Sequence, residues 1–128
     1  MKTKIIMIVS FLVFTFILLL GMTIVAATIT KNSANEGAGL IDRYNPIVQW
    51  DESYIKTCDP VKKGPHDTAT YRGTVINDEG KTRPLEFLAL KVLAKDRYLK
   101  IKHKGAHVES YEEVKKDKLP KEVRKKLK

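Results

Sequence analysis

The chain has 128 residues, the length of one domain, and carries a formal net charge of +9 at pH 7. A single cysteine, Cys58, excludes an intramolecular disulfide and therefore a disulfide-framed secreted mini-protein. Residues 5–29 contain no charged side chain, whereas everything after Asn45 mixes polar and apolar residues. The two parts cannot share one water-soluble core, so we expect one small domain preceded by a membrane-directed segment.

Residues 1–29 are predicted to be either a signal peptide or a signal-anchor transmembrane helix. The apolar run of about 25 residues is long enough for a bilayer, which a helix crosses in about 20. The run is apolar all round, which argues against a helix buried in a soluble core. It also ends in small residues that a signal peptidase could cut after Ala27. Lys2 and Lys4 favour the cytoplasmic side, so both alternatives place the downstream domain outside the membrane.

Residues 30–46 are small, polar and glycine-containing, and this composition predicts a linker. Five strands are then expected, over residues 47–57, 68–77, 85–93, 98–103 and 108–114. Residues 77–80 predict a hairpin turn in which Gly80 takes the left-handed conformation. Apolar residues on both faces of 85–93 predict a central strand covered on both sides, and Gly73 predicts a bulge.

The C-terminus is predicted to be a short basic helix that follows Pro120. Leu119, Val123 and Leu127 fall four residues apart on one face, which favours docking on the domain. Residues 115–128 hold eight basic and two acidic residues, which are either a solvated face or a site for anionic lipid or wall polymer. The predicted fold class is mainly β. Residues 47–128 form a small OB-like five-stranded barrel with a short C-terminal helix, preceded by the N-terminal hydrophobic helix.

The sequence after residue 45 resembles the YxeA-like family of small exported proteins of Gram-positive bacteria. The similar stretches are Asn45-Pro46, Asp78-Glu79-Gly80-Lys81, Tyr98-Leu99-Lys100-Ile101, residues 105–114 (GAHVESYEEV) and Leu119-Pro120-Lys121. The resemblance implies an OB-like five-stranded barrel, in agreement with the strand count. It implies no activity, because the family has no assigned one, and it brings no active-site residues.

Candidate catalytic and metal-binding residues are few. Cys58 would need a positioned base to act as a nucleophile, and spacing alone does not bring His66 to it. His103 and His107 have a metal-ligand spacing, with Glu109 as a third candidate, but they flank a predicted turn. The paired acidic residues at 51–52 and 112–113 point to opposite faces of a strand, and those at 78–79 belong to the turn, so neighbours make no acid/base dyad. No catalytic, cofactor-binding or metal-binding residues are predicted, and we expect no enzyme.

Nucleic acid is not an expected partner. Aromatic residues among basic ones resemble a stacking platform, but they equally fit the core and rim of a barrel; they are Tyr71, Phe87, Tyr98 and Tyr111. Export away from cellular nucleic acid also argues against that role.

The sequence therefore predicts a non-enzymatic binding module of the cell envelope, held in the membrane with its domain outside. Its partner would be an envelope protein or an anionic polymer. The alternative is a secreted cationic effector released by cleavage after Ala27. The oligomeric state is left open.

Overall fold

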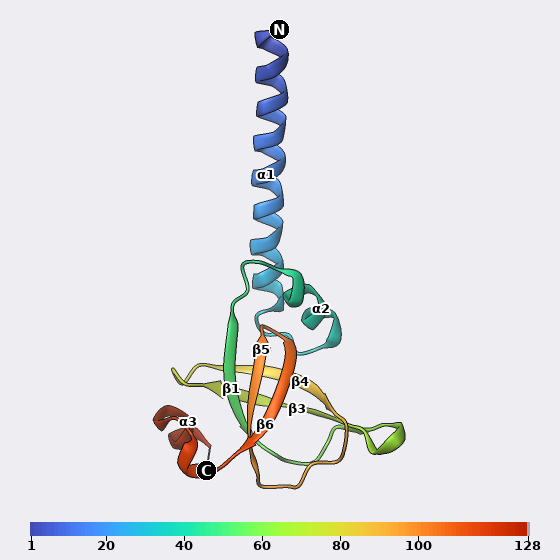
Figure 1. Cartoon of the computed structure of the whole chain (residues 1–128), viewed down its shortest axis with the longest axis vertical. Coiled ribbons are helices and arrows are strands. Elements are labelled where there is room, and N and C mark those ends of the chain that lie inside the picture. Colours follow the sequence, from blue (N-terminus) through green and yellow to red (C-terminus); the bar gives the residue numbers. More distant parts are fainter. Residues whose placement is uncertain (128) are drawn as a thin grey trace.

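The computed structural model describes residues 1–127 and places a curled β sheet below a long N-terminal helix (Figure 1). The elements are α1 (Lys2–Thr30), α2 (Glu36–Tyr44), β1 (Trp50–Lys56), β2 (Lys62–Lys63), β3 (Ala69–Asn77), β4 (Thr82–Ala89), β5 (Tyr98–Lys104), β6 (His107–Val114) and α3 (Lys121–Lys126), with single 3₁₀ turns at Pro65–Asp67 and Lys116–Lys118. The predicted N-terminal helix, strand-rich domain and C-terminal helix are all present.

Helix α1 extends away from the domain and, over residues 5–22, exposes apolar side chains around its whole circumference. Within residues 1–127 it is the one helix long and apolar enough to cross a membrane. Its threonine hydroxyls donate to carbonyl groups of the preceding turn, for example Thr15 to Phe11 at 2.8 Å and Thr28 to Ile24 at 2.9 Å. These bonds satisfy the hydroxyls within the helix, as a hydrocarbon environment requires.

The sheet is antiparallel, with strand order β2-β3-β1-β5-β6 and with β4 paired to β3. Strand β1 pairs along its whole length with β5, from Trp50 to Lys56, but contacts β3 through two residues only, Ser53 and Tyr54. The sheet therefore turns a corner at β1, and β3 and β4 cross the direction of β1, β5 and β6 (Figure 1). The mainly β, OB-like class is confirmed, as a half-barrel that stays open between β4 and β6.

The concave side of the half-barrel holds the main core. Its buried members are Ile55, Ala69, Tyr71, Val75, Leu85, Phe87, Ala89, Leu99 and Ile101. Phe87 links two walls, because its ring lies 5.5 Å from that of Tyr71 on β3 and 5.3 Å from that of Tyr111 on β6. These contacts hold the curled sheet together by apolar burial and ring packing.

The prediction of a central strand over residues 85–93 was wrong. Strand β4 ends at Ala89 and pairs with β3 alone among the described strands. Leu85, Phe87 and Ala89 are buried, whereas Leu88 and Leu90 remain 59% and 78% exposed. The apolar run gave no indication that its second face lacks a covering layer, because periodicity describes the strand and not its neighbours.

Gly73 does not form the predicted bulge, because β3 keeps a continuous register with β4 through Gly73 and Leu85. A Cβ at Gly73 would lie 2.6 Å from Ile55 Cδ1, so glycine here permits the close approach of a core side chain. The register shift lies instead between Lys102 and His103. The hairpin prediction at Gly80 is confirmed, since its φ is 82°.

The predicted linker over residues 30–46 contains a helix, α2, that the sequence analysis did not expect. Asn35 Oδ1 accepts a hydrogen bond from the Ala38 amide at 2.8 Å and so caps the start of this helix. Gly39 allows close packing, since a Cβ there would lie 3.2 Å from the Ala106 carbonyl oxygen. The small residues that suggested a flexible linker instead let the helix lie against the β5–β6 turn.

Helix α3 covers the outer side of the sheet at the other end of the domain. Leu119 and Val123 are 2% and 0% exposed and pack with Tyr54 and Ile76, and Leu127 borders this cluster. The prediction that the C-terminal apolar face docks on the barrel is confirmed for residues 115–127. Lys128, the last residue of the basic tail, lies outside the described residues.

Candidate functional site

The C-terminal residue of α1, Thr30, is joined to the β domain through a buried carboxylate. Asp42 of α2 is 1% exposed; its Oδ1 accepts from Thr30 Oγ1 at 2.5 Å and its Oδ2 accepts from the Ala106 amide at 2.6 Å. Gly105 has a φ of 56° and no room for a Cβ beside Asp42. A single side chain therefore fastens the end of α1 to the β5–β6 turn.

Two further polar contacts join α1 and the segment after it to the domain. Asn45 Nδ2 donates to the Thr23 carbonyl oxygen at 2.8 Å, and Arg83 of β4 donates to the Ser33 carbonyl oxygen at 3.1 Å. Burial lowers the pKa of the Arg83 guanidinium, partly offset by Asp42 and Asp51. We name the contacts of Asp42, Asn45 and Arg83 the anchor junction.

The small residues at the end of α1 have a structural role. Thr23, Ala26, Ala27 and Thr30 share one helix face and are the residues of this segment that α2 and its flanks cover in part or fully. Ala26 and Ala27, which belong to the pattern that resembles a signal-peptidase site, thus also pack α1 against the domain. Sequence analysis missed this role, because small residues are typical both of a signal-peptidase site and of a closely packed helix face.

A buried serine–histidine pair lies next to the anchor junction. His103 Nδ1 is 2.9 Å from the Gly105 carbonyl oxygen, which can only accept, so Nδ1 carries the proton. His103 Nε2 therefore accepts from Ser53 Oγ at 2.7 Å. Burial lowers the pKa of His103, and the Arg83 charge acts in the same direction. Both side chains are 2% exposed, so the pair braces β1 against β5 and offers no surface to a substrate.

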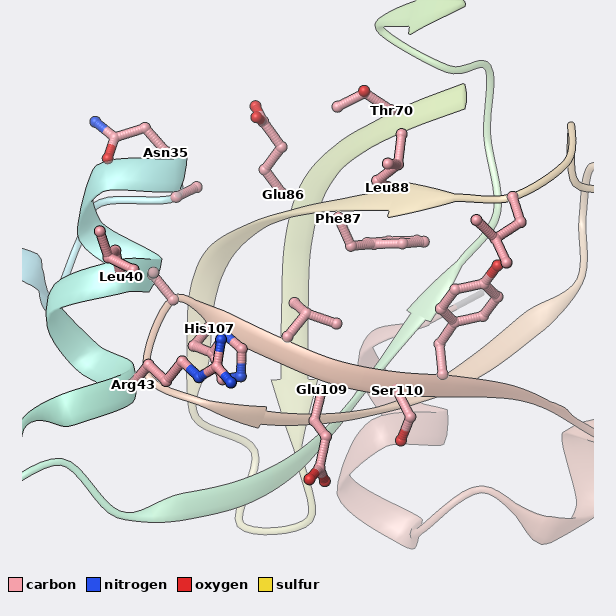
Figure 2. A pocket seen from close by; sticks show the side chains of 16 residues that line it. Asn35, Leu40, Arg43, Thr70, Glu86, Phe87, Leu88, His107, Glu109 and Ser110 are labelled. Atoms are coloured by element: carbon pink, nitrogen blue, oxygen red, sulfur yellow. The ribbon is translucent and has the colours of Figure 1, made fainter. Parts of the chain in front are cut away.

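A groove of about 610 Å³ runs along the open side of the half-barrel (Figure 2). Strands β4 and β6 form its two sides and α2 closes one end, with Phe87 at its floor. Its polar side chains carry both signs of charge, and its exposed apolar ones are Leu40, Leu88 and Leu90. Each flanking strand uses one edge for pairing in the described sheet, so its other edge faces the groove.

The residues considered as catalytic or metal ligands do not form a site together. Cys58 is exposed, and its thiol contacts the Asp59 carbonyl oxygen at 3.6 Å. His107 packs its ring edge-on to Trp50 at 6.2 Å, whereas His103 is buried on the inner side of the sheet. Within residues 1–127, no group of three His, Cys, Asp or Glu side chains is placed to hold a metal ion.

Lys100 and Lys102 of β5 lie on the outer face of the sheet and pair with carboxylates of neighbouring strands. Lys100 Nζ is 3.2 Å from Glu52, and Lys102 Nζ is 2.7 Å from Glu109. The Glu52 carboxylate raises the pKa of Lys100. Of the aromatic residues considered for base stacking, Tyr71 and Phe87 are buried in the core and are not a surface platform.

A curled antiparallel half-barrel joined to an apolar N-terminal helix defines a small β-rich protein with one helix long enough to cross a membrane. A sequence profile of the family described as a protein of unknown function, DUF1093, matches residues 46–117. The chain is 36% identical over 87 residues to "Uncharacterized protein YxeA" of Bacillus subtilis (strain 168), covering 68% of this chain and 76% of that protein. The chain therefore belongs to the DUF1093 family, which confirms the resemblance found in its sequence.

Two solved structures share the fold. The crystal structure of a DUF1093 family protein from Bacillus subtilis has a TM-score of 0.61 and 35% sequence identity, covering 67% of this chain and 99% of that chain. The solution structure of a protein from Bacillus cereus, described as membrane associated, has a TM-score of 0.51 and 33% identity, covering 61% of this chain and 83% of that chain.

Proposed function

We propose that this protein is a non-enzymatic binding module, anchored by α1 in the cell membrane with its half-barrel outside, that holds an extended segment of an envelope protein. The observation that carries the proposal is the open side between β4 and β6. A strand that enters there can bond to backbone groups of both free edges and place side chains against Leu88 and Phe87. Such recognition needs no catalytic residues.

The anchor junction supports an uncut signal anchor over a released effector. Cleavage after Ala27 would separate Thr23 from its partner Asn45 and divide the helix face that packs on α2. Lys2 and Lys4 at the opposite end of α1 favour the cytoplasm, which orients the domain outward. The membrane association named for the Bacillus cereus protein is consistent with this arrangement.

Site-specific photocrosslinking tests the groove. A photoreactive amino acid at Leu88 or Ser110 of the full chain, expressed in intact cells, should form an adduct with one and the same envelope protein. The control position is Lys62, which is exposed on β2 and outside the groove. Adducts that are equally frequent at Lys62, or that persist unchanged in a Leu88→Arg variant crosslinked from Ser110, would contradict binding in the groove.

A second ligand class, an anionic wall polymer, is supported by where α3 lies. This helix is at the end of the domain opposite α1, and Lys121 and Lys125 on it are exposed (Figure 1). Replacing these two residues and Arg124 by glutamine keeps the buried Leu119 and Val123. If the polymer binds here, wall association should become weaker and less dependent on salt in this variant. Unchanged association at every salt concentration would exclude the role.

Intact-mass analysis of the protein from membrane and medium fractions tests the anchor. We expect the membrane-bound chain to retain residues 1–27. A chain recovered mainly from the medium and beginning at Thr28 would establish the alternative, a secreted cationic effector.

A further inference from the structure

Helix α2 has its polar and apolar sides placed opposite to those of an ordinary surface helix. Its inward face carries Ala38 and the buried Asp42. Its outward face carries Leu40, Ile41 and Tyr44, which are 61%, 48% and 73% exposed, and Ile47 just after the helix is 41% exposed. In a domain surrounded by water, such a helix would turn its apolar side inward. We call Leu40, Ile41, Tyr44 and Ile47 the collar.

The anchor junction sets the position of the collar along α1. Asp42 is bonded to Thr30, and Asn45 is bonded to Thr23, which lies about 10 Å closer to the N-terminus of α1 at 1.5 Å per residue. The chain therefore rises beside α1 from residue 42 to residue 45. Figure 1 shows the end of α2 and the following loop beside the lower turns of α1.

The length of free helix then determines where the membrane ends. Residues 5–22 lie beyond the Asn45–Thr23 contact and span about 27 Å, close to the roughly 30 Å hydrocarbon thickness of a bilayer. Exposed apolar side chains continue on the C-terminal side of the Asn45–Thr23 contact, since Ile24, Val25 and Ile29 are 50%, 57% and 69% exposed. Protein does not cover them, so the level of the collar is itself an apolar zone on α1.

Charge at this end fits phospholipid headgroups. Arg43 is exposed at the edge of the collar, with its guanidinium carbon 5.5 Å from the centre of the Tyr44 ring. Lys104 donates to the Arg43 carbonyl oxygen at 3.1 Å. Tyrosine and arginine at the boundary of an apolar helix are the residues that settle at the headgroup level of a membrane.

We propose that the collar is a second membrane contact, in which α2 and residues 44–47 insert into the headgroup and acyl boundary of the outer leaflet. The domain would then stand at a fixed height and orientation, with the groove beside the lipid surface and α3 facing away from it. This inference rests on the proposed anchoring by α1, and it adds that the folded domain itself contacts lipid.

Fluorescence depth measurement tests the contact. The full chain with Cys58→Ser and one new cysteine, Ile41→Cys or Ile47→Cys, is labelled with an environment-sensitive dye and reconstituted in vesicles of equal parts phosphatidylcholine and phosphatidylglycerol. Lys116→Cys, exposed near α3, is the matched control. At both collar positions we expect blue-shifted emission and several-fold stronger quenching by lipids spin-labelled near the headgroup than at position 116.

Flotation with the vesicles after an alkaline wash reports anchoring by α1 separately, and the emission of Trp50 reports folding. Labels that behave like position 116 in folded, floating protein would overturn the collar proposal while leaving the anchor intact. A blue shift that disappears when the lipid-to-protein ratio is raised would also overturn the collar proposal, because a second copy of the chain, and not lipid, would then cover the collar. Loss of flotation would instead contradict the proposed function.

Discussion

The two ends of the β domain are held by opposite kinds of contact. At the end that carries α1, the anchor junction depends on hydrogen bonds that Asp42 accepts and that Asn45 and Arg83 donate. At the other end, α3 docks through Leu119 and Val123 against Tyr54 and Ile76. Hydrogen bonds at the anchor junction depend on direction, whereas the apolar packing of α3 does not.

This difference has a mechanical consequence. A buried acceptor such as Asp42 holds the Ala106 amide at a fixed position, because a small displacement leaves that donor without a partner. Apolar packing at α3 tolerates sliding at a gradual cost. The junction is therefore suited to transmit the orientation of α1 to the sheet, whereas α3 mainly covers apolar surface.

Breaking the junction should have the largest effect. Asp42→Ala leaves the buried Ala106 amide without its acceptor, whereas the Thr30 hydroxyl can still donate to the Ala26 carbonyl oxygen at 3.0 Å. We therefore expect a loss of about 3 kcal/mol of unfolding free energy, the upper end for one hydrogen bond to a charged group. Denaturant titration in detergent micelles, followed by the emission of Trp50, measures it. Asp42→Asn keeps one acceptor and one donor and should recover part of the loss. Equal stability of Asp42→Ala and the unaltered chain would refute the importance of this carboxylate.

Truncating the apolar contact at the other end should cost less. Leu119→Ala removes a side chain that is 2% exposed, but α3 can shift to fill the space, so we expect about 2 kcal/mol, the lower end for such substitutions. The same titration measures this, with the partly buried Leu127→Ala as a milder control. Hydrogen exchange should show the loss confined to α3 and its contacts. An effect that reaches α2 would mean that the two ends are not independent.

The sequence predicts the apolar end far better than the polar one. The spacing of Leu119, Val123 and Leu127 predicts that they share one face of a helix. Alternating apolar and polar residues likewise predict the strands. The partners of Asp42 are 12 and 64 residues away, so no local pattern reveals them. Asn35 caps α2 and precedes EGAGL, but the glycines and polar residues of this segment are typical of a linker.

The candidate groove was beyond sequence analysis for a related reason. Leu88 and Leu90 could be recognised as apolar, but whether a neighbouring strand covers them depends on how β3 and β4 fold across β1. Likewise Ser53 and His103 are 50 residues apart and meet only because β1 pairs with β5. Pairing of distant strands, and not local propensity, creates both features.

Acid should weaken the domain beside the junction before it affects α3. Burial lowers the pKa of His103, so below its unfolded value of about 6.5 the unfolded chain takes up a proton that the native state excludes. The unfolding free energy should therefore fall as pH decreases from about 6.5 toward the lowered native pKa. Titrations across this range, compared with His103→Gln, measure it. A variant with the same pH dependence as the unaltered chain would assign the effect to other groups.

The smallest effect should come from the core that separates the two ends. Gly73→Ala places a methyl group 2.6 Å from Ile55 Cδ1, but that atom is the end of a flexible side chain and alanine reduces the entropy of the unfolded chain. We expect a net loss of about 1 kcal/mol, typical of mild overpacking. Ile55→Val removes Cδ1, so Gly73→Ala should cost less in that background than alone. A double-mutant cycle measures the coupling, and strictly additive effects would show that the strain arises from the backbone of β3 instead.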